Sequence, residues 1–220
     1  MRKIVGLFRF ASTYVRLVRD TDRLDLVFAL ADSVDESPGL RRMLGRPEVK
    51  AYLARPLPPL QLELADLRAL PEGSLGREFA RFLDERKLDP TGVYHSALDT
   101  SDDTAQLKRH LERSHDLWHT VLGFDTDVAG ELGLQAFYIA QLQSPLGHLL
   151  LSAGLLNGML FNHEDGDRRM EAITRGWRLG KATRPLFGAD WAAMLTWPIE
   201  QVREHFGITP EHVRTAAMAA

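Results

Sequence analysis

Two histidines lie four residues apart in the segment His115-Asp116-Leu117-Trp118-His119. In a helix, this spacing places the two side chains about 40° apart around the axis and about 6 Å apart along it. Two imidazoles at that separation can bind one metal ion, as in metalloenzyme helices with histidines at i and i+4. Asp116 lies about 60° from His119 on the helical wheel, at the edge of the same face. The segment therefore offers two imidazoles and a carboxylate to a metal ion.

Glu131 adds a second carboxylate if the chain turns back after this helix. The helix is predicted to end at Gly123, and the run Asp125-Thr126-Asp127 supplies residues that can cap the next helix. His119 precedes the turn by about one helical turn and Glu131 follows it by about one, so an antiparallel hairpin would place them at the same level. The alternative is that these are ordinary helix residues with solvated carboxylates. Two carboxylates beside two imidazoles favour the metal site.

The ligand types restrict the metal. The chain has no cysteine, which excludes disulfides, zinc ribbons, cysteine-ligated iron–sulfur clusters and thiol catalysis. Mixed imidazole and carboxylate ligands suit Zn, Mn, Co or Fe(II), and also Mg when waters complete the shell. Four protein ligands still admit a water or a substrate oxygen if the shell expands, and a catalytic site needs such an open position.

The composition of the 220-residue chain is that of an ordinary globular protein, with 45% hydrophobic and 26% charged residues. Its formal net charge of −3 lacks the basic excess of proteins that grip nucleic-acid phosphates, so we expect no nucleic-acid partner. The most apolar stretch, Pro145 to Phe161, is shorter than the ~20 residues that cross a bilayer, and a buried helix is predicted there. The usual signals of nucleotide-binding and serine-hydrolase sites are absent from the sequence.

Helical periodicity extends along almost the whole chain, and runs with strand character are nearly lacking. The sequence shows no internal repeat and no linker long enough to separate domains. We therefore predict an all-α fold, a single helical domain over residues 1–220 with a metal-binding helical hairpin and an apolar groove or tunnel. The main helices are expected at Leu24–Ser33, Ser74–Arg86, Thr104–Leu122, about Val128–Gln143, Pro145–Phe161, Arg168–Arg184 and Pro198–Phe206.

The N-terminus is basic and amphipathic, with five basic residues among apolar ones before Asp20. A first helix that packs its apolar stripe into the core is the favoured interpretation. A helix lying on a membrane surface is the second interpretation. An arginine-rich organelle presequence is the third, and the scarcity of serine argues against it.

Four glycines in two helical segments indicate either close packing or an open groove. Gly147, Gly154 and Gly158 share one face of the apolar helix, and Gly130 lies in the helix before it. Each glycine inside a helix costs up to ~1 kcal/mol relative to alanine, so their number calls for a reason. Tight helix contact is one reason. The other is an apolar tunnel that ends at the metal, in which an isoprenoid would gain about 0.8 kcal/mol per buried methylene-sized unit.

Two runs of the sequence resemble the family of coenzyme Q (ubiquinone) biosynthesis protein 4. They are Leu70–Leu83, LPEGSLGREFARFL, and HDLWHTVLG with Glu131 twelve positions beyond its second histidine. The second run matches the family signature His-Asp-x-x-His, eleven residues, then Glu. The resemblance extends to Arg23-Leu24-Asp25, Arg46-Pro47 and the closing segment from Trp197 to Arg203, and so covers most of the chain.

The resemblance implies an all-helical fold and a divalent metal, most often zinc. It assigns as ligands, and as the residues of a catalytic centre, His115, Asp116, His119 and Glu131, with either carboxylate able to act as base. It implies an isoprenoid lipid or a prenylated quinone precursor as ligand. The residues predicted to line the lipid site are the four glycines of the apolar tunnel: Gly130, Gly147, Gly154 and Gly158. The implied reaction is oxidative decarboxylation of a polyprenyl-hydroxybenzoate ring, in which hydroxyl replaces carboxyl.

The implied partners are a membrane surface, which the protein would contact peripherally, and other quinone-biosynthesis proteins. A homodimer is also compatible with the sequence. A bacterial source predicts a cytoplasmic protein at the inner membrane, and a eukaryotic source predicts the matrix side of the mitochondrial inner membrane. The acidic turn at Phe124–Asp127 and the lack of an evident presequence favour the bacterial source. Two other functions remain open. One is a non-catalytic lipid carrier or scaffold, and the other is a metallohydrolase, which would need ligands that the sequence does not show.

Overall fold

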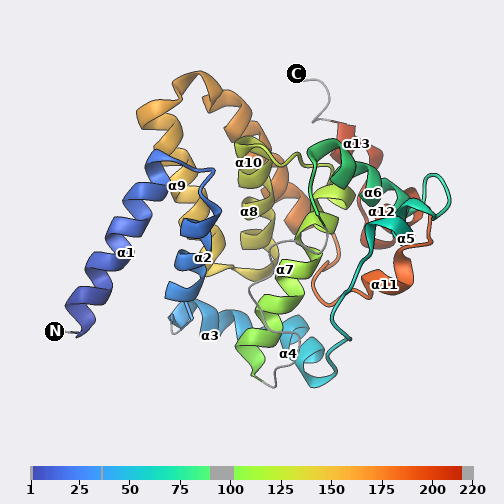
Figure 1. Ribbon diagram of the computed structural model, residues 1–220, viewed down its shortest axis with the longest axis horizontal. Coiled ribbons are helices and arrows are strands. Elements are labelled where there is room, and N and C mark those ends of the chain that lie inside the picture. Colours follow the sequence, from blue (N-terminus) through green and yellow to red (C-terminus); the bar gives the residue numbers. More distant parts are fainter. Residues whose placement is uncertain (1, 36, 90–101, 215–220) are drawn as a thin grey trace. The chain divides into compact units, whose positions relative to one another are not determined.

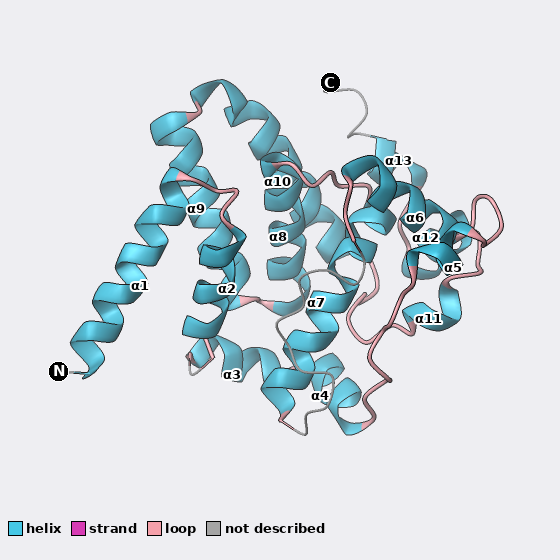
Figure 2. Ribbon diagram, in the orientation of Figure 1, coloured by secondary structure: helices cyan, strands magenta, loops and turns pink. Residues whose placement is uncertain are grey.

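The computed structural model describes residues 2–35, 37–89 and 102–214. Within these ranges the chain forms helices and no strand, which confirms the all-α prediction (Figure 2). The α-helices are α1 Arg2–Arg19, α2 Leu24–Ser33, α3 Pro38–Leu44, α4 Pro47–Ala54, α5 Leu64–Arg68, α6 Leu75–Arg86, α7 Asp103–Leu122, α8 Val128–Leu142, α9 Pro145–Phe161, α10 Gly166–Ala182, α11 Trp191–Met194, α12 Ile199–Phe206 and α13 Pro210–Arg214. A short 3-10 turn, η1, spans His163–Asp165.

Side-chain caps set several helix starts within a residue or two of the predicted ones. The side chains of Ser74, Asp102, Asp127 and Ser144 each accept a hydrogen bond from the amide three residues ahead. Such caps satisfy amide groups that have no partner inside the helix. At the end of α7, Gly123 adopts a φ of 68°, the left-handed conformation that favours glycine. Local chemistry therefore fixes the boundaries of the helices that carry the candidate ligands.

The contacts divide the chain into two compact units, and each unit combines two separate segments. The first unit comprises Met1–Met43 and Asp127–Lys181, and the second comprises Leu44–Thr126 and Ala182–Ala220. Because the chain passes from one unit to the other more than once, no single linker in the sequence separates them. The prediction of one domain over residues 1–220 stays a prediction.

In the first unit, α9 packs against α1, α2 and α8 (Figure 1). Leu17 and Val18 of α1 join two leucines of α2 and Ala153 of α9 in a buried apolar cluster. The amide of Asn157 donates to the carbonyl of Val18 over 2.9 Å, and so ties α9 to the end of α1. Phe10 and Tyr14 also pack against this cluster, so the favoured interpretation of the N-terminal helix holds for its C-terminal half.

The prediction that Pro145–Phe161 is a buried helix is correct for the helix but wrong for its burial. Five apolar residues of α9 are 36% to 57% exposed: Leu155, Leu156, Met159, Leu160 and Phe161. The neighbouring helices cover one side of α9, because its glycines allow them to approach closely there. Hydrophobic composition alone does not show which side of a helix finds a partner.

The second unit is built around α7, which contacts α4, α6 and α12. Arg203 of α12 donates to the carbonyls of Val121 (3.0 Å) and Thr120 (3.2 Å). These carbonyls belong to the last turn of α7, where they have no partner inside the helix. An arginine at a helix C-terminus also interacts favourably with the helix dipole. Arg203 therefore stabilises the turn of α7 that contains His119.

Candidate metal centre

His119 is completely buried, with 0% of its surface exposed. Its ring stacks on Phe82 of α6, with centroids 6.0 Å apart and planes inclined by 24°. Arg86 covers Phe82 at 4.1 Å from the ring centroid, and donates through Nε to Asp125 over 2.9 Å. These contacts hold the imidazole between α6 and the turn that follows α7. A buried imidazole in a fixed orientation is well suited to be a metal ligand.

The second nitrogen of His119 fixes its tautomer. Nδ1 lies 3.3 Å from the carbonyl oxygen of Phe124. A carbonyl can accept a hydrogen bond but cannot donate one, so the proton of the neutral ring is on Nδ1. Nε2 then carries the lone pair of the neutral ring. Histidines that bind metals commonly donate their other ring N–H to a backbone carbonyl in this way.

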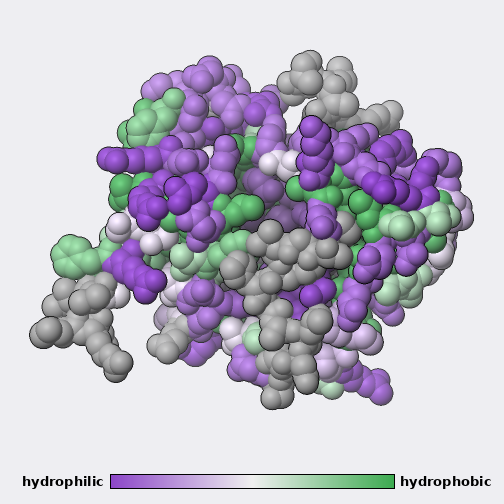
Figure 3. All heavy atoms as spheres, viewed as in Figure 1, coloured by the Kyte–Doolittle hydropathy of each residue, from purple (hydrophilic) through white to green (hydrophobic). Residues whose placement is uncertain are grey.

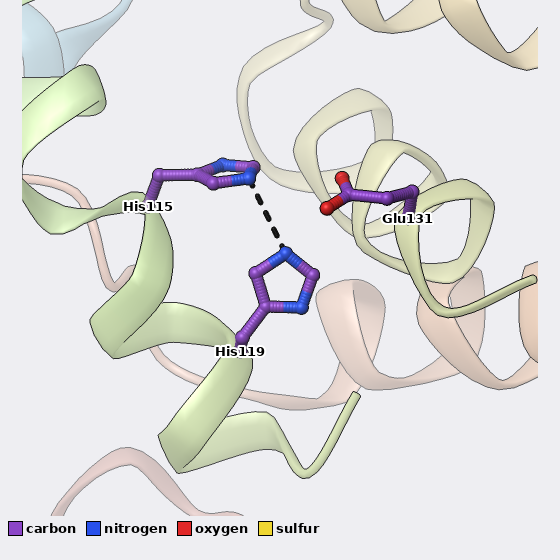
Figure 4. A group of neighbouring side chains, drawn as sticks. All are labelled: His115, His119 and Glu131. Atoms are coloured by element: carbon purple, nitrogen blue, oxygen red, sulfur yellow. Dashed lines mark hydrogen bonds between the residues drawn. The ribbon is translucent and has the colours of Figure 1, made fainter. Parts of the chain in front are cut away.

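His115 directs its Nε2 at the Nε2 of His119, and the two atoms are 3.3 Å apart (Figure 4). The rings are nearly perpendicular, at 80°. Two ligands bound tetrahedrally at the usual Zn–N distance would be separated by about 3.3 Å. The i, i+4 pair of the sequence therefore has the separation that one shared ion requires.

Glu131 completes a group of three. One ligand atom from each of His115, His119 and Glu131 lies within 4.8 Å of the other two, and Figure 4 shows the carboxylate turned toward the imidazoles. Glu131 lies in the first turn of α8, where its amide donates to the carbonyl of Asp127 over 2.9 Å. Two histidines and one glutamate match the donor set of catalytic zinc sites, which keep a further position open. The residues therefore fit a divalent metal.

Asp116, the fourth predicted ligand, is not in this group. It is partly buried, and its main-chain carbonyl accepts a hydrogen bond from the Thr120 hydroxyl over 3.0 Å. The adjacent position on a helix points about 100° away from His115, so the helix itself separates these two side chains. The assignment of Asp116 as a ligand stays a prediction.

Sequence reasoning missed the groups that orient His119. Phe124 acts through its main-chain carbonyl, and a main-chain group has no signature in the sequence. Phe82 and Arg86 come from the α6 region, which resembles the family but shows no spacing relation to the histidines. The sequence predicts only a helix-capping role for Asp125. Burial opposes its ionisation, but hydrogen bonds from the Thr126 amide and from Arg86 outweigh burial and hold its pKa below the usual value.

The space beside the glycines predicted to border a lipid is occupied by other residues of the protein. A Cβ at Gly154 would lie 2.4 Å from a methyl carbon of Leu132, and one at Gly158 would lie 3.3 Å from the Arg169 guanidinium. At Gly147, a Cβ would lie 3.1 Å from Ile139. Gly130 is buried in the first turn of α8, where its amide donates to Asp127 over 2.8 Å. These contacts favour close packing over a groove at three of the glycines, and lipid binding beside all four stays a prediction.

Comparison with known proteins identifies the class. Residues 12–212 match the family model described as "Coenzyme Q (ubiquinone) biosynthesis protein Coq4". The chain therefore belongs to the Coq4 family, as its histidine and LPEGSLGREFARFL motifs predict.

Individual relatives agree with this assignment. The ubiquinone biosynthesis protein COQ4 homologue of Danio rerio, named as mitochondrial, is 31% identical over 60% of this chain and 51% of its own length. The mitochondrial coq4 protein of Talaromyces stipitatus is 28% identical over 83% of this chain and 60% of its own. The matches thus span about half to three-fifths of these relatives. A crystal structure from Nostoc punctiforme, of a protein provisionally assigned to ubiquinone biosynthesis, superposes with a TM-score of 0.79 at 30% identity, over 91% of this chain and 97% of that one.

Proposed function

We propose that the chain binds a divalent metal ion, with zinc the first choice, through His115, His119 and Glu131, and that this centre acts in ubiquinone biosynthesis. The observation that carries the proposal is the buried ring of His119. Its Nδ1 is directed at the Phe124 carbonyl, so Nε2 is left for an ion beside Glu131. The family match supplies the pathway.

The reaction we propose is oxidative decarboxylation of a polyprenyl-hydroxybenzoate ring. With dioxygen as oxidant, one carboxylic acid, one O₂ and one water balance to one phenol, one CO₂ and one hydrogen peroxide. A divalent cation in the centre would act as a Lewis acid toward the ring oxygens. Glu131 and Asp116 are the two carboxylates of the predicted ligand set, and we propose that one of them accepts the phenolic proton. Phe124, Phe82 and Arg86 keep His119 from turning.

The test uses the purified 220-residue chain, a prenylated hydroxybenzoate labelled in its carboxyl carbon, and dioxygen. Labelled CO₂ and the matching phenol should form with one or more of Zn, Mn, Co, Fe(II) and Mg. Chelation should stop their formation, and so should His115→Ala. His148→Ala is the matched control, because His148 is an exposed histidine of α9 outside the metal group. If no metal supports turnover, the enzymatic proposal fails.

A membrane-bound carrier or scaffold is the second candidate, and the exposed apolar residues of the first unit favour it. Besides the five of α9, they include Leu7 and Phe8 of α1, 68% and 73% exposed, and Trp177 of α10, 48% exposed. Hydrophobic atoms reach the surface over α1 and the upper part of α9, at the left of Figure 3. The α1 helix also carries arginines and no acidic residue. This composition suits an anionic bilayer surface.

Within the described residues, no helix is both long enough and apolar enough to cross a bilayer. We therefore propose peripheral contact through α1 and α9. In this second function the metal holds the polar head of a prenylated precursor without turnover. Lipid retention and pathway output should then fall together in metal-site variants. If output is lost while lipid retention is unchanged, the carrier proposal is contradicted.

A further inference from the structure

One side of α10 is exposed. Met170 and Trp177 are 50% and 48% exposed, and their spacing of seven residues places them about two turns apart on the same side of the helix. The other exposed residues on this side are a threonine and four charged residues: Asp167, Glu171, Thr174, Arg178 and Lys181. We call this set of residues, together with Met170 and Trp177, the α10 face.

The charged residues of the α10 face are not paired inside the chain. Within the described residues, no side-chain hydrogen bond or ion pair is present for any of them, whereas Arg168 and Arg169, on other sides of the helix, both pair with Asp165. An anionic bilayer would repel the two carboxylates of the face, and α1, by contrast, has no acidic residue. The composition of the α10 face therefore favours a protein partner of mixed charge over a membrane.

The opposite side of α10 is held firmly by its neighbours in the first unit. A Cβ at Gly176 would lie 1.8 Å from the carbonyl oxygen of Gly133, so α10 and α8 are in backbone contact there. Arg169 is 4% exposed and donates through Nη1 to the carbonyl of Gly154 in α9 over 2.8 Å. The α10 face is therefore preformed, and a preformed surface loses less conformational entropy when it binds.

The charges of the α10 face are arranged symmetrically about Thr174. Asp167 and Lys181 lie seven residues before and after it, and Glu171 and Arg178 lie three before and four after. In an antiparallel pair of identical helices centred on Thr174, each acidic residue lies opposite a basic residue of the other copy. A parallel pair would place like charges opposite each other, which is destabilising. The charge pattern is thus complementary to itself in the antiparallel orientation.

The apolar residues follow the same symmetry. Residues seven apart on a helix differ by only about 20° around its axis, so Met170 and Trp177 form one stripe, and Glu171 and Arg178 form another on the far side of Thr174. A twofold axis perpendicular to the plane of two antiparallel helices keeps each stripe on its own side. Met170 of one copy then packs on Trp177 of the other. Tryptophan and methionine are enriched in protein interfaces.

We propose that two copies of the chain associate through the α10 face, as an antiparallel helix pair with Thr174 at the twofold axis. The same surface of both copies forms the contact, as in other twofold dimers. The face of one 17-residue helix is small, and interfaces below about 1,200 Å² are typical of weak complexes. We therefore expect a dissociation constant on the order of 10–100 µM. This dimer does not rest on the function proposed for the metal centre.

Sedimentation equilibrium of the 220-residue chain measures the association directly. Between about 1 and 300 µM the chain should pass from monomer to dimer, and salt should weaken the dimer. Lys181→Glu and Asp167→Lys should each weaken it about tenfold or more, because the twofold axis repeats every repulsive contact. An equal mixture of these two variants should associate as wild type does, since opposite charges face each other again. Lys50→Glu, at an exposed position of α4, is the charge-matched control and should have no effect.

Cross-linking tests the register of the helix pair. The chain has no cysteine, so a single introduced thiol reports one position. Thr174→Cys should form a disulfide between copies under mild oxidation, because the two positions meet at the twofold axis. Asp167→Cys is the matched control on the same face. In the antiparallel pair the two copies of position 167 are about 20 Å apart along the helices, so this variant should not cross-link.

Several results would overturn the proposal. One is a chain that stays monomeric over the whole concentration range. Another is a dimer that the two charge variants leave unchanged, or one that their mixture does not restore. Equal cross-linking of Thr174→Cys and Asp167→Cys would contradict the antiparallel register. Trp177→Ala should weaken the dimer about tenfold. If it leaves the dimer intact and lowers binding to anionic vesicles instead, the α10 face serves a membrane.

Discussion

The imidazole Nδ1 of His119 lies 3.3 Å from the carbonyl oxygen of Phe124, which follows the last residue of the same helix by two positions. The amides of Gly123 and Phe124 in turn donate to the carbonyl of His119, over 2.8 Å and 3.1 Å. The turn that ends α7 thus orients the imidazole of His119, the candidate metal ligand one turn before it. Helix termination and the orientation of the His119 ring depend on the same few atoms.

This relationship predicts that Gly123→Ala will damage the proposed metal site indirectly. Gly123 has a φ of 68°, which costs an alanine about 1 kcal/mol, so the turn should shift and move the Phe124 carbonyl. Loss of a partner that orients a metal ligand typically weakens metal binding by about 10–100-fold. Titration with zinc against a competing chelator measures this change.

Gly207→Ala is its matched control. Gly207 ends α12 with a φ of 77°, and a Cβ there would have no atom within 4 Å. The two variants should lose similar stability, but zinc affinity should fall in Gly123→Ala alone. Equal affinities in both would show that the Phe124 carbonyl does not orient the ligand.

The contact between α8 and α10 predicts a strong effect for Gly176→Ala. A Cβ at Gly176 would lie 1.8 Å from the carbonyl oxygen of Gly133, so the two backbones must separate. Overpacking of this kind costs typically 1–3 kcal/mol or more, which is roughly 5 °C of melting temperature in a protein of this size. Gly166→Ala, at the start of the same helix and with nothing within 4 Å, should change stability by about 1 kcal/mol or less. Similar melting temperatures for the two would contradict the close contact.

His110 predicts a dependence of stability on pH. Burial, assisted by the positive charge of Arg109, lowers its pKa from 6.5 to about 4. Between these two values the unfolded chain binds the proton and the folded chain does not. The contribution of this histidine is therefore complete above pH 6.5 and is lost as pH falls toward 4, by up to about 3 kcal/mol.

The variant His110→Gln keeps an acceptor for the Gly188 amide but does not titrate. Urea unfolding at several pH values should show that wild type loses more stability than this variant between pH 6.5 and 4. All other titrating groups are common to both proteins, so the difference between the curves isolates His110. Parallel curves would mean that its imidazole is as easily protonated in the folded protein as in the unfolded chain.

The exposed apolar residues of α9 predict an effect on membrane binding. Met159 and Leu160 are 57% and 52% exposed, so changing both to glutamate should leave the melting temperature nearly unchanged. Binding to phosphatidylglycerol-containing vesicles should fall at least about tenfold, because a charged side chain is costly in the acyl region. Lys50→Glu, at an exposed position of α4, changes the net charge by the same amount and serves as control. Co-sedimentation distinguishes them, and equal loss in both would indicate a purely electrostatic effect.

The sequence by itself determined the helices, several of their caps and the spacing of the two histidines on α7. Helix formation depends on residues within about four positions of one another, and Ser74, Asp102, Asp127 and Gly123 act over that range. The spacing of His115 and His119 likewise needs nothing beyond the geometry of one helix.

Only the tertiary structure decided which helix faces would be covered. It placed Phe82 and Arg86 beside His119 and filled the space at Gly154 with Leu132. These outcomes depend on packing between distant segments and on main-chain groups such as the Phe124 carbonyl. Helical periodicity in the sequence indicates that one face of a helix is apolar, but it does not indicate which segment covers that face.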